Sequence, residues 1–151
     1  MAGRGGGKTK RVRKALVNYG DITIYLQPMP QHFPLLKPLY WMGSTLKDLR
    51  DSSEGVKDGI GYALELVQRG EKPSNAKPLK GFGGASVLEV VEDFDGDTWR
   101  AVYTVAIADA IYVLHFFQKK AKKGIATPKK EIDLIRKRLR DAIEHGRAGR
   151  S

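Results

Sequence analysis

Basic side chains lie next to three predicted strands, and they are the residues of this chain most able to do chemistry. They are Lys77 and Lys80 before the first strand, Arg100 within the second, and Lys119, Lys120, Lys122 and Lys123 after the third. On that third strand His115 and Phe117 point to one face, because side chains alternate with a period of two. Cations that bind phosphates, next to aromatic rings that stack on bases, predict a surface for RNA.

The same residues also admit structural interpretations. His115 sits inside an apolar strand, where a hydrogen-bonded core histidine is the more common situation, and at least one of Phe116 and Phe117 must face a helix. Arg100 within a hydrophobic strand requires either a carboxylate such as Glu89 or an anionic ligand. We favour the ligand over a purely structural pair.

Two further patterns imitate ligand sites without completing them. Gly7-Lys8-Thr9 resembles the end of a phosphate-binding loop, but the glycine that the motif needs is Ala2 and no strand can precede it. Asp93, Asp95 and Asp97 resemble a calcium loop that lacks its later glycine and glutamate. The chain has no cysteine and three scattered histidines, so we expect no metal site.

The elements that must position the basic residues follow from hydrophobic spacing. Strands are predicted where apolar and β-branched residues gather, and helices where apolar residues recur every three or four positions after a capping residue. The predicted elements are a strand at 39–42, a helix after Ser44, a helix from Ser52 or Ser53 to Gly70, strands at 87–91 and 99–107 joined by an acidic turn, a buried strand at 111–117, and a helix beginning at Thr127 and Pro128. The second helix has a predicted apolar stripe of Val56, Ile60, Ala63, Leu64 and Val67, and the last helix has one of Ile132, Ile135, Leu139 and Ala142. This β-α-α-β-β-β-α order predicts an α+β fold with helices around an antiparallel-rich sheet.

The length of the chain indicates its domain organisation, and its charge distribution indicates the kind of partner it binds. At 151 residues the chain has room for one domain and an arm, and its net charge is +10. Residues 1–14 carry +6, residues 119–140 carry +8, and the rest carries −4, a distribution that favours a polyanionic partner. We predict a basic, largely disordered extension at 1–36 with a short strand near 22–26, a domain at 37–145, and a flexible tail at 146–151. No apolar stretch reaches membrane-spanning length and no secretory signal is present, so we expect a cytoplasmic protein that contacts no membrane.

Four segments, in order, make the chain similar to a known family. They are KPLYWMGSTLKDLRDS, AKPLKGFGGASVLEV, WRAVYTV and IYVLHFFQKKAKKGIATPKKEIDLIRKRL. Together they closely resemble the phage-derived, HigB-type branch of the RelE superfamily of toxins, over residues 37–145. The specific combination is Lys-Pro-Leu-Lys-Gly, then Trp-Arg-Ala-Val-Tyr, then His-Phe-Phe-Gln-Lys-Lys.

The resemblance implies a type II toxin that cleaves mRNA in the ribosomal A site and is held inactive by a helix-turn-helix antitoxin. It implies attack of a ribose 2′-hydroxyl on the adjacent phosphate, with cationic side chains stabilising the extra charge and no metal or cofactor required. The antitoxin is expected to cover the surface at 119–123 or to displace the last helix.

The resemblance also assigns roles to single residues. When the strand at 39–42 is counted as the first, Arg100 matches the family's phosphate-binding arginine on the third strand, and Lys119 and Lys120 match the basic pair after the fourth. His115 and Glu89 are the candidates for proton transfer. The candidates for RNA binding are Lys77, Lys80, Lys122, Lys123 and Phe117. We expect Arg100→Ala to abolish cleavage and leave the fold intact.

Two other functions fit the same residues. A non-catalytic RNA- or DNA-binding module would use the charges alone, with His115 in the core. A phage-derived protein-interaction domain would present its basic face to an acidic partner, and its affinity for RNA would depend weakly on salt.

Overall fold

The computed structural model describes residues 15–19, 22–26, 36–83, 86–119 and 126–149. The chain divides into two compact units, residues 1–34 and residues 35–151. In the first unit β1 (Ala15–Tyr19) pairs antiparallel with β2 (Ile22–Leu26). The strand expected near 22–26 is confirmed, whereas β1 lies where the sequence pattern predicted no strand.

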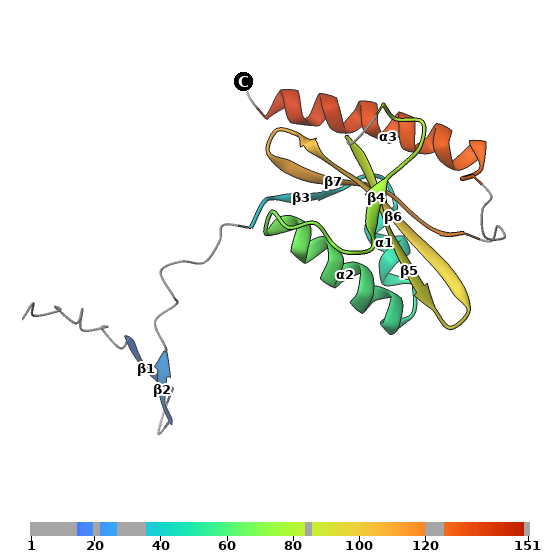
Figure 1. The fold of residues 1–151 in the computed structure, drawn as a ribbon. Helices are drawn as coiled ribbons and strands as arrows, with labels where there is room; N and C mark the ends of the chain where they lie inside the picture. The colour runs from blue at the N-terminus through green and yellow to red at the C-terminus, as the bar shows by residue number, and fades with distance from the viewer. Residues whose placement is uncertain (1–14, 20–21, 27–35, 84–85, 120–125, 150–151) are drawn as a thin grey trace, which may run out of the picture. The chain divides into compact units, whose positions relative to one another are not determined.

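The described residues of the second unit form a five-stranded sheet and three helices (Figure 1). Its elements in chain order are β3 (Leu39–Trp41), α1 (Thr45–Arg50), α2 (Glu54–Gln68), β4 (Ala76–Pro78), β5 (Val87–Phe94), β6 (Asp97–Ile107), β7 (Ala110–Lys119) and α3 (Lys129–Ala148). The strand order across the sheet is β3-β7-β6-β5-β4. All neighbours are antiparallel except β3 and β7, which are parallel. The α+β class and the predicted order of elements are confirmed, with β4 as an added edge strand.

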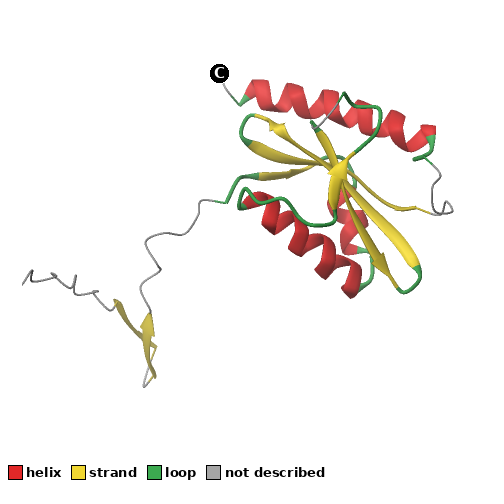
Figure 2. Cartoon of the chain, viewed as in Figure 1, coloured by secondary structure: helices red, strands yellow, loops and turns green. Residues whose placement is uncertain are grey.

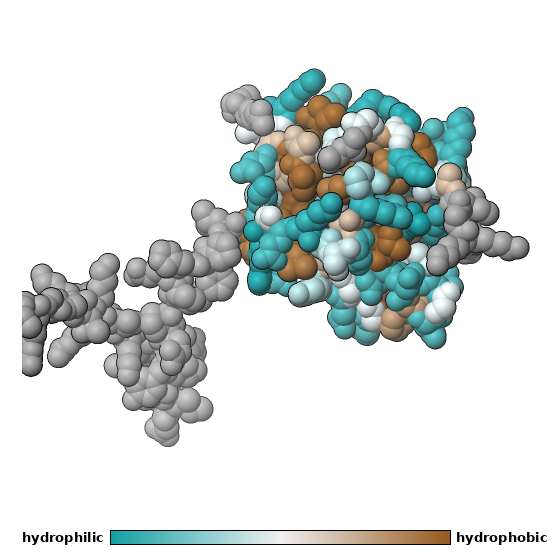
Figure 3. Space-filling view, viewed as in Figure 1, coloured by the Kyte–Doolittle hydropathy of each residue, from teal (hydrophilic) through white to brown (hydrophobic). Residues whose placement is uncertain are grey.

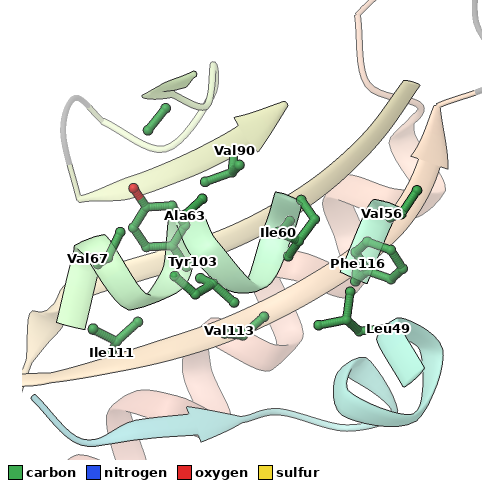
Figure 4. Packing of buried hydrophobic residues seen from close by; sticks show 13 residues of the cluster. Leu49, Val56, Ile60, Ala63, Val67, Val90, Tyr103, Ile111, Val113 and Phe116 are labelled. Carbon is green, nitrogen blue, oxygen red and sulfur yellow. The ribbon is translucent and has the colours of Figure 1, made fainter. Parts of the chain in front are cut away.

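The helices cover the two faces of this sheet. Figure 2 shows α3 on one side of the strands and α1 with α2 on the other. The predicted apolar stripe of α2 is fully buried: Val56, Ile60, Ala63, Leu64 and Val67. In Figure 4 this stripe points toward Tyr103 and Val113 of the sheet. Burying one apolar stripe of a helix against a sheet face is the main source of stability for such a layer.

The second core lies between α3 and the opposite face of the sheet. Ile135 and Ala142 are fully buried there, and Ile132 and Leu139 pack beside them, as the apolar stripe predicted. Pro128 is the N-cap residue with extended backbone, one position before its predicted place inside the helix. The helix continues through Ala148, so the expected domain end at His145 falls inside α3.

A tight turn between β5 and β6 and a bulge in β7 determine which side chains these strands direct toward α3. Asp95 and Gly96 have positive φ (52° and 82°), the conformation of the tight turn that the acidic hairpin predicted. In β7 the register changes from Val102 opposite His115 to Tyr103 opposite Val113, so Leu114 forms a bulge. The bulge places Leu114 as well as His115 near α3.

Candidate functional site

A buried ion pair lies on the face of the sheet that α3 partly covers. Arg100 Nη1 on β6 donates hydrogen bonds of 2.8 and 2.7 Å to the two carboxylate oxygens of Glu89 on β5. The side chains of Glu89 and Arg100 are only 4% and 11% exposed. Both point to one face because Glu89 is opposite Val102 and Arg100 is opposite Val91, two residues along each strand.

Two lysines complete a group that we call the cationic cluster, formed by Lys77, Glu89, Arg100 and Lys119. Lys77 is opposite Glu89 across β4 and β5, and its Nζ lies 3.7 Å from Glu89 Oε1. Lys119 ends β7 opposite Thr98, two residues from the partner of Arg100. Three cations surround one carboxylate, so the cluster carries excess positive charge that an anion would neutralise.

The electrostatics of Lys119 reflect this setting. Burial lowers the pKa of its ammonium group, and the charge of Arg100 lowers it further. Lys77 acts in the same direction, whereas Glu89 opposes the shift. A lysine whose pKa is lowered among cations exchanges protons more readily near neutral pH than an ordinary surface lysine.

Arg100 keeps hydrogen-bonding capacity that Glu89 does not use. Its Nε is buried and has no hydrogen-bond partner among the described residues. The sequence left two partners open for Arg100, a carboxylate such as Glu89 or an anionic ligand, and the ligand was favoured. The structure shows the carboxylate, and the position of Lys77 and Lys119 beside the pair leaves the cluster suited to an anion as well.

His115 belongs to a separate network beside the cluster. It is 6% exposed, and its Nε2 is hydrogen-bonded to Glu131 of α3. Arg138 Nη1 lies 3.1 Å from His115 Nδ1. Because arginine only donates, Nδ1 accepts this bond and Nε2 carries the ring proton toward Glu131. Burial lowers the pKa of His115, and Glu131 offsets part of that shift. This is the hydrogen-bonded core histidine of the structural interpretation.

Arg138 is the centre of this network, and sequence reasoning missed it. It also donates to the bulged Leu114 carbonyl at 3.0 Å and to Ser44 Oγ at 3.3 Å. Gly43 has φ +57°, and a Cβ there would lie 2.7 Å from the guanidinium. Arg138 thereby joins α3 to β7 and to the turn before α1.

The remaining predicted residues are distributed around the cluster. Phe117 is opposite Arg100, is half-buried, and stacks on His115 with ring centroids 4.8 Å apart. Lys80 is exposed just beyond β4. Lys120, Lys122 and Lys123 lie outside the described residues. The structure therefore brings together Lys77, Glu89, Arg100, Phe117 and Lys119, with His115 behind Phe117.

The surface around these elements is mostly polar. Figure 3 shows hydrophilic side chains over most of the face in view, with hydrophobic side chains exposed in patches between them. Among the described residues no group of three or more His, Asp or Glu side chains is arranged to hold a metal ion. None of the described helices has an apolar stretch long enough to cross a membrane.

Comparison with known proteins gives a family assignment. No curated protein and no solved structure matched the chain. Residues 47–140 match the family model described as phage derived protein Gp49-like (DUF891). The match begins in α1 and ends within α3, so it spans the cationic cluster and the His115 network. The chain therefore belongs to the phage-derived Gp49-like family, a RelE/toxin-like family.

Proposed function

We propose that this chain is the toxin of a type II toxin–antitoxin pair, of the HigB-type branch, and that it cleaves mRNA on the ribosome. The observation that carries the proposal is the cationic cluster: three cations around Glu89, on a sheet face within the family match. Phosphodiester cleavage by an internal hydroxyl needs stabilisation of a doubly charged phosphorane, which fixed cations provide.

In the proposed reaction the 2′-oxygen forms a bond to phosphorus and the bond from phosphorus to the 5′-oxygen breaks. The products are a 2′,3′-cyclic phosphate and a 5′-hydroxyl. Arg100 holds the phosphate, with its orientation fixed by Glu89, and Lys77 adds charge from the neighbouring strand. Lys119 in its neutral form takes the proton of the 2′-hydroxyl and becomes a cation as the phosphorane forms; burial and the neighbouring cations lower its pKa and so raise the fraction of the neutral form. The leaving 5′-oxygen receives a proton from water.

The geometry favours positioning roles for the two residues that the sequence put forward for proton transfer. Both carboxylate oxygens of Glu89 accept hydrogen bonds from Arg100. Both ring nitrogens of His115 are occupied, by Glu131 and Arg138. We assign to Glu89 the placing of Arg100 and to His115 the placing of the Phe117 ring, on which a base can stack.

Because the carboxylate of Glu89 and the ring nitrogens of His115 already have hydrogen-bond partners, the structure also favours a second candidate, a non-catalytic RNA-binding module. In that case the cationic cluster binds a phosphate and no proton moves. RNA fragments with cyclic phosphate ends exclude this candidate, because binding alone makes no new ends.

The test is to incubate the purified protein with a defined mRNA, with and without programmed ribosomes, and to map the 5′ ends. Cleavage within an A-site codon only when ribosomes are present supports the proposal. Cleavage of naked RNA would support a nuclease activity that does not depend on the ribosome. Intact RNA in both samples would favour the binding module. Lys119→Met should lose cleavage, whereas Lys137→Met, an exposed lysine of α3, should keep it.

An antitoxin with a helix-turn-helix domain completes the proposal. An acidic segment over Lys77 and Lys119 would neutralise the cationic cluster. Displacement of α3 would instead remove Glu131 and Arg138 from His115. Charge reversal at Lys119 that leaves antitoxin binding unchanged would exclude the first mode.

A further inference from the structure

An arginine of α3 lies over an aromatic ring in the segment that follows β4. The Cζ atom of Arg136 is 4.9 Å from the centroid of the Phe82 ring, and its Nη2 donates to the Gly81 carbonyl at 3.2 Å. Phe82 is half-buried and packs on the core between α3 and the sheet. The guanidinium is therefore held by a ring below it and by a hydrogen bond at its edge.

This arrangement holds a planar guanidinium group over an aromatic ring at an exposed position of α3. Arg136 is an exposed residue although its guanidinium has two fixed contacts. Unpaired RNA bases stack on guanidinium planes as well as on aromatic rings. A guanidinium that is already oriented loses less conformational entropy on binding a base than a free arginine side chain does.

The position of this surface relates it to the cationic cluster. Phe82 follows Lys77 by five residues, with exposed Lys80 between them. Five residues span at most about 18 Å, so one RNA strand with a phosphate at Arg100 and Lys77 can reach Phe82 within a few nucleotides. Lys80 lies on that path and can meet an intervening phosphate.

We propose that Arg136, held over the Phe82 ring, is a stacking site for an unpaired nucleobase that flanks the phosphate bound at the cationic cluster. The inference rests on the proposed function, because it takes RNA as the ligand of that cluster. It adds a residue of α3 that contacts the flat face of a base, separately from the residues that bind the phosphate.

The test is a coupling experiment between one side chain and one base. Arg136→Lys keeps the charge and removes the flat guanidinium, and Arg140→Lys makes the same change at another exposed position of α3. Each protein is titrated at low salt with a short RNA that cannot be cleaved, and with copies in which one base at a time is removed. At one position, base removal should weaken binding to the wild type by about fivefold or more. It should weaken binding to Arg136→Lys by much less, and Arg140→Lys should behave as the wild type does.

The inference would be overturned if, at every position, base removal weakened binding to Arg136→Lys as much as it weakened binding to the wild type. The base and Arg136 would then not interact. A scan in which no base removal matters would also overturn the inference, and it is the result expected if an acidic protein is the ligand of this surface. Phe82→Leu, which removes the ring but keeps apolar packing, should reduce the same coupling. Thermal unfolding of each variant shows that it is folded. The binding experiment needs no cleavage, so failure of the nuclease proposal and failure of this inference are distinguishable.

Discussion

Replacing Arg100 should cost stability as well as cleavage, which differs from the expectation that the fold stays intact. Arg100→Gln leaves Glu89 as a buried carboxylate without its main partner, because the Glu89 side chain is only 4% exposed. Removal of one member of a buried pair costs about 3–5 kcal/mol. Lys77, 3.7 Å from Glu89, stays in place and keeps the loss near the lower end of that range.

Urea unfolding followed by circular dichroism measures this loss. With a slope of about 1–3 kcal/mol per M, a loss of about 3 kcal/mol lowers the midpoint by about 1–3 M. Since small domains have only about 5–15 kcal/mol of stability, cleavage by Arg100→Gln must be assayed where the variant is shown to be folded.

A double variant separates stability from catalysis. Glu89→Gln combined with Arg100→Gln removes both charges of the pair. The urea midpoint of this double variant should therefore be higher than that of Arg100→Gln and closer to the wild-type value, while cleavage stays absent. An unchanged midpoint in Arg100→Gln would refute the reasoning that the pair supports the fold. Cleavage by the stable double variant would refute the role of Arg100 at the phosphate.

Three further predictions follow from single side chains. Burial lowers the pKa of His115, so the unfolded chain takes up a proton first, and the free energy of unfolding should fall from about pH 7.5 to about pH 5.5. His115→Gln should show a smaller fall, and an equal one would contradict the shift. The pKa of Lys119 is lowered, so the cleavage rate should rise with pH and level off below about pH 10.4, whereas Lys119→Arg should show no such rise in its residual rate. A Cβ at Gly146 would lie 2.4 Å from Ile107, so Gly146→Ala should lower the free energy of unfolding, measured in urea, by about 1–3 kcal/mol. Gly61→Ala, with open space around it, should raise stability by about 0.5–1 kcal/mol, and equal effects would contradict the packing described.

The elements with strong local patterns were predictable from the sequence. The stripe from Val56 to Val67 repeats at helical spacing because α2 buries a single face. The turn at Asp95 and Gly96 needs positive φ, and an Asp-Gly pair provides it at little cost. These signals depend only on neighbours along the chain.

The features that depend on distant partners were not predictable. β4 has three residues and exists because it pairs with β5, and β3 is parallel to β7 although residues 42–109 separate them. No short-range period encodes such pairings. The extent of α3 was missed for a related reason, since Gly146 packs against Ile107 in the β6–β7 region.

The candidate site divides in the same way. The Glu89–Arg100 pair was one of two alternatives for Arg100, because a buried arginine requires an anion. The partners of His115 could not be read from the sequence. Arg138 lies 23 residues away, and its contact also depends on the bulge at Leu114. Glu131 is visible in the sequence as an acid in the first turn of α3. Its hydrogen bond to His115 forms only because α3 packs on the sheet, so the sequence alone did not identify this pair.

The most direct test of the central claim replaces one hydroxyl in the substrate. Once the cut in a defined mRNA has been mapped on programmed ribosomes, the nucleotide on its 5′ side is made 2′-deoxy and the assay is repeated with EDTA-treated protein. The proposed reaction predicts that this bond stays intact while the unmodified mRNA gives a 2′,3′-cyclic phosphate end. Cleavage of the deoxy substrate at the same bond would contradict attack by the 2′-hydroxyl at the cationic cluster.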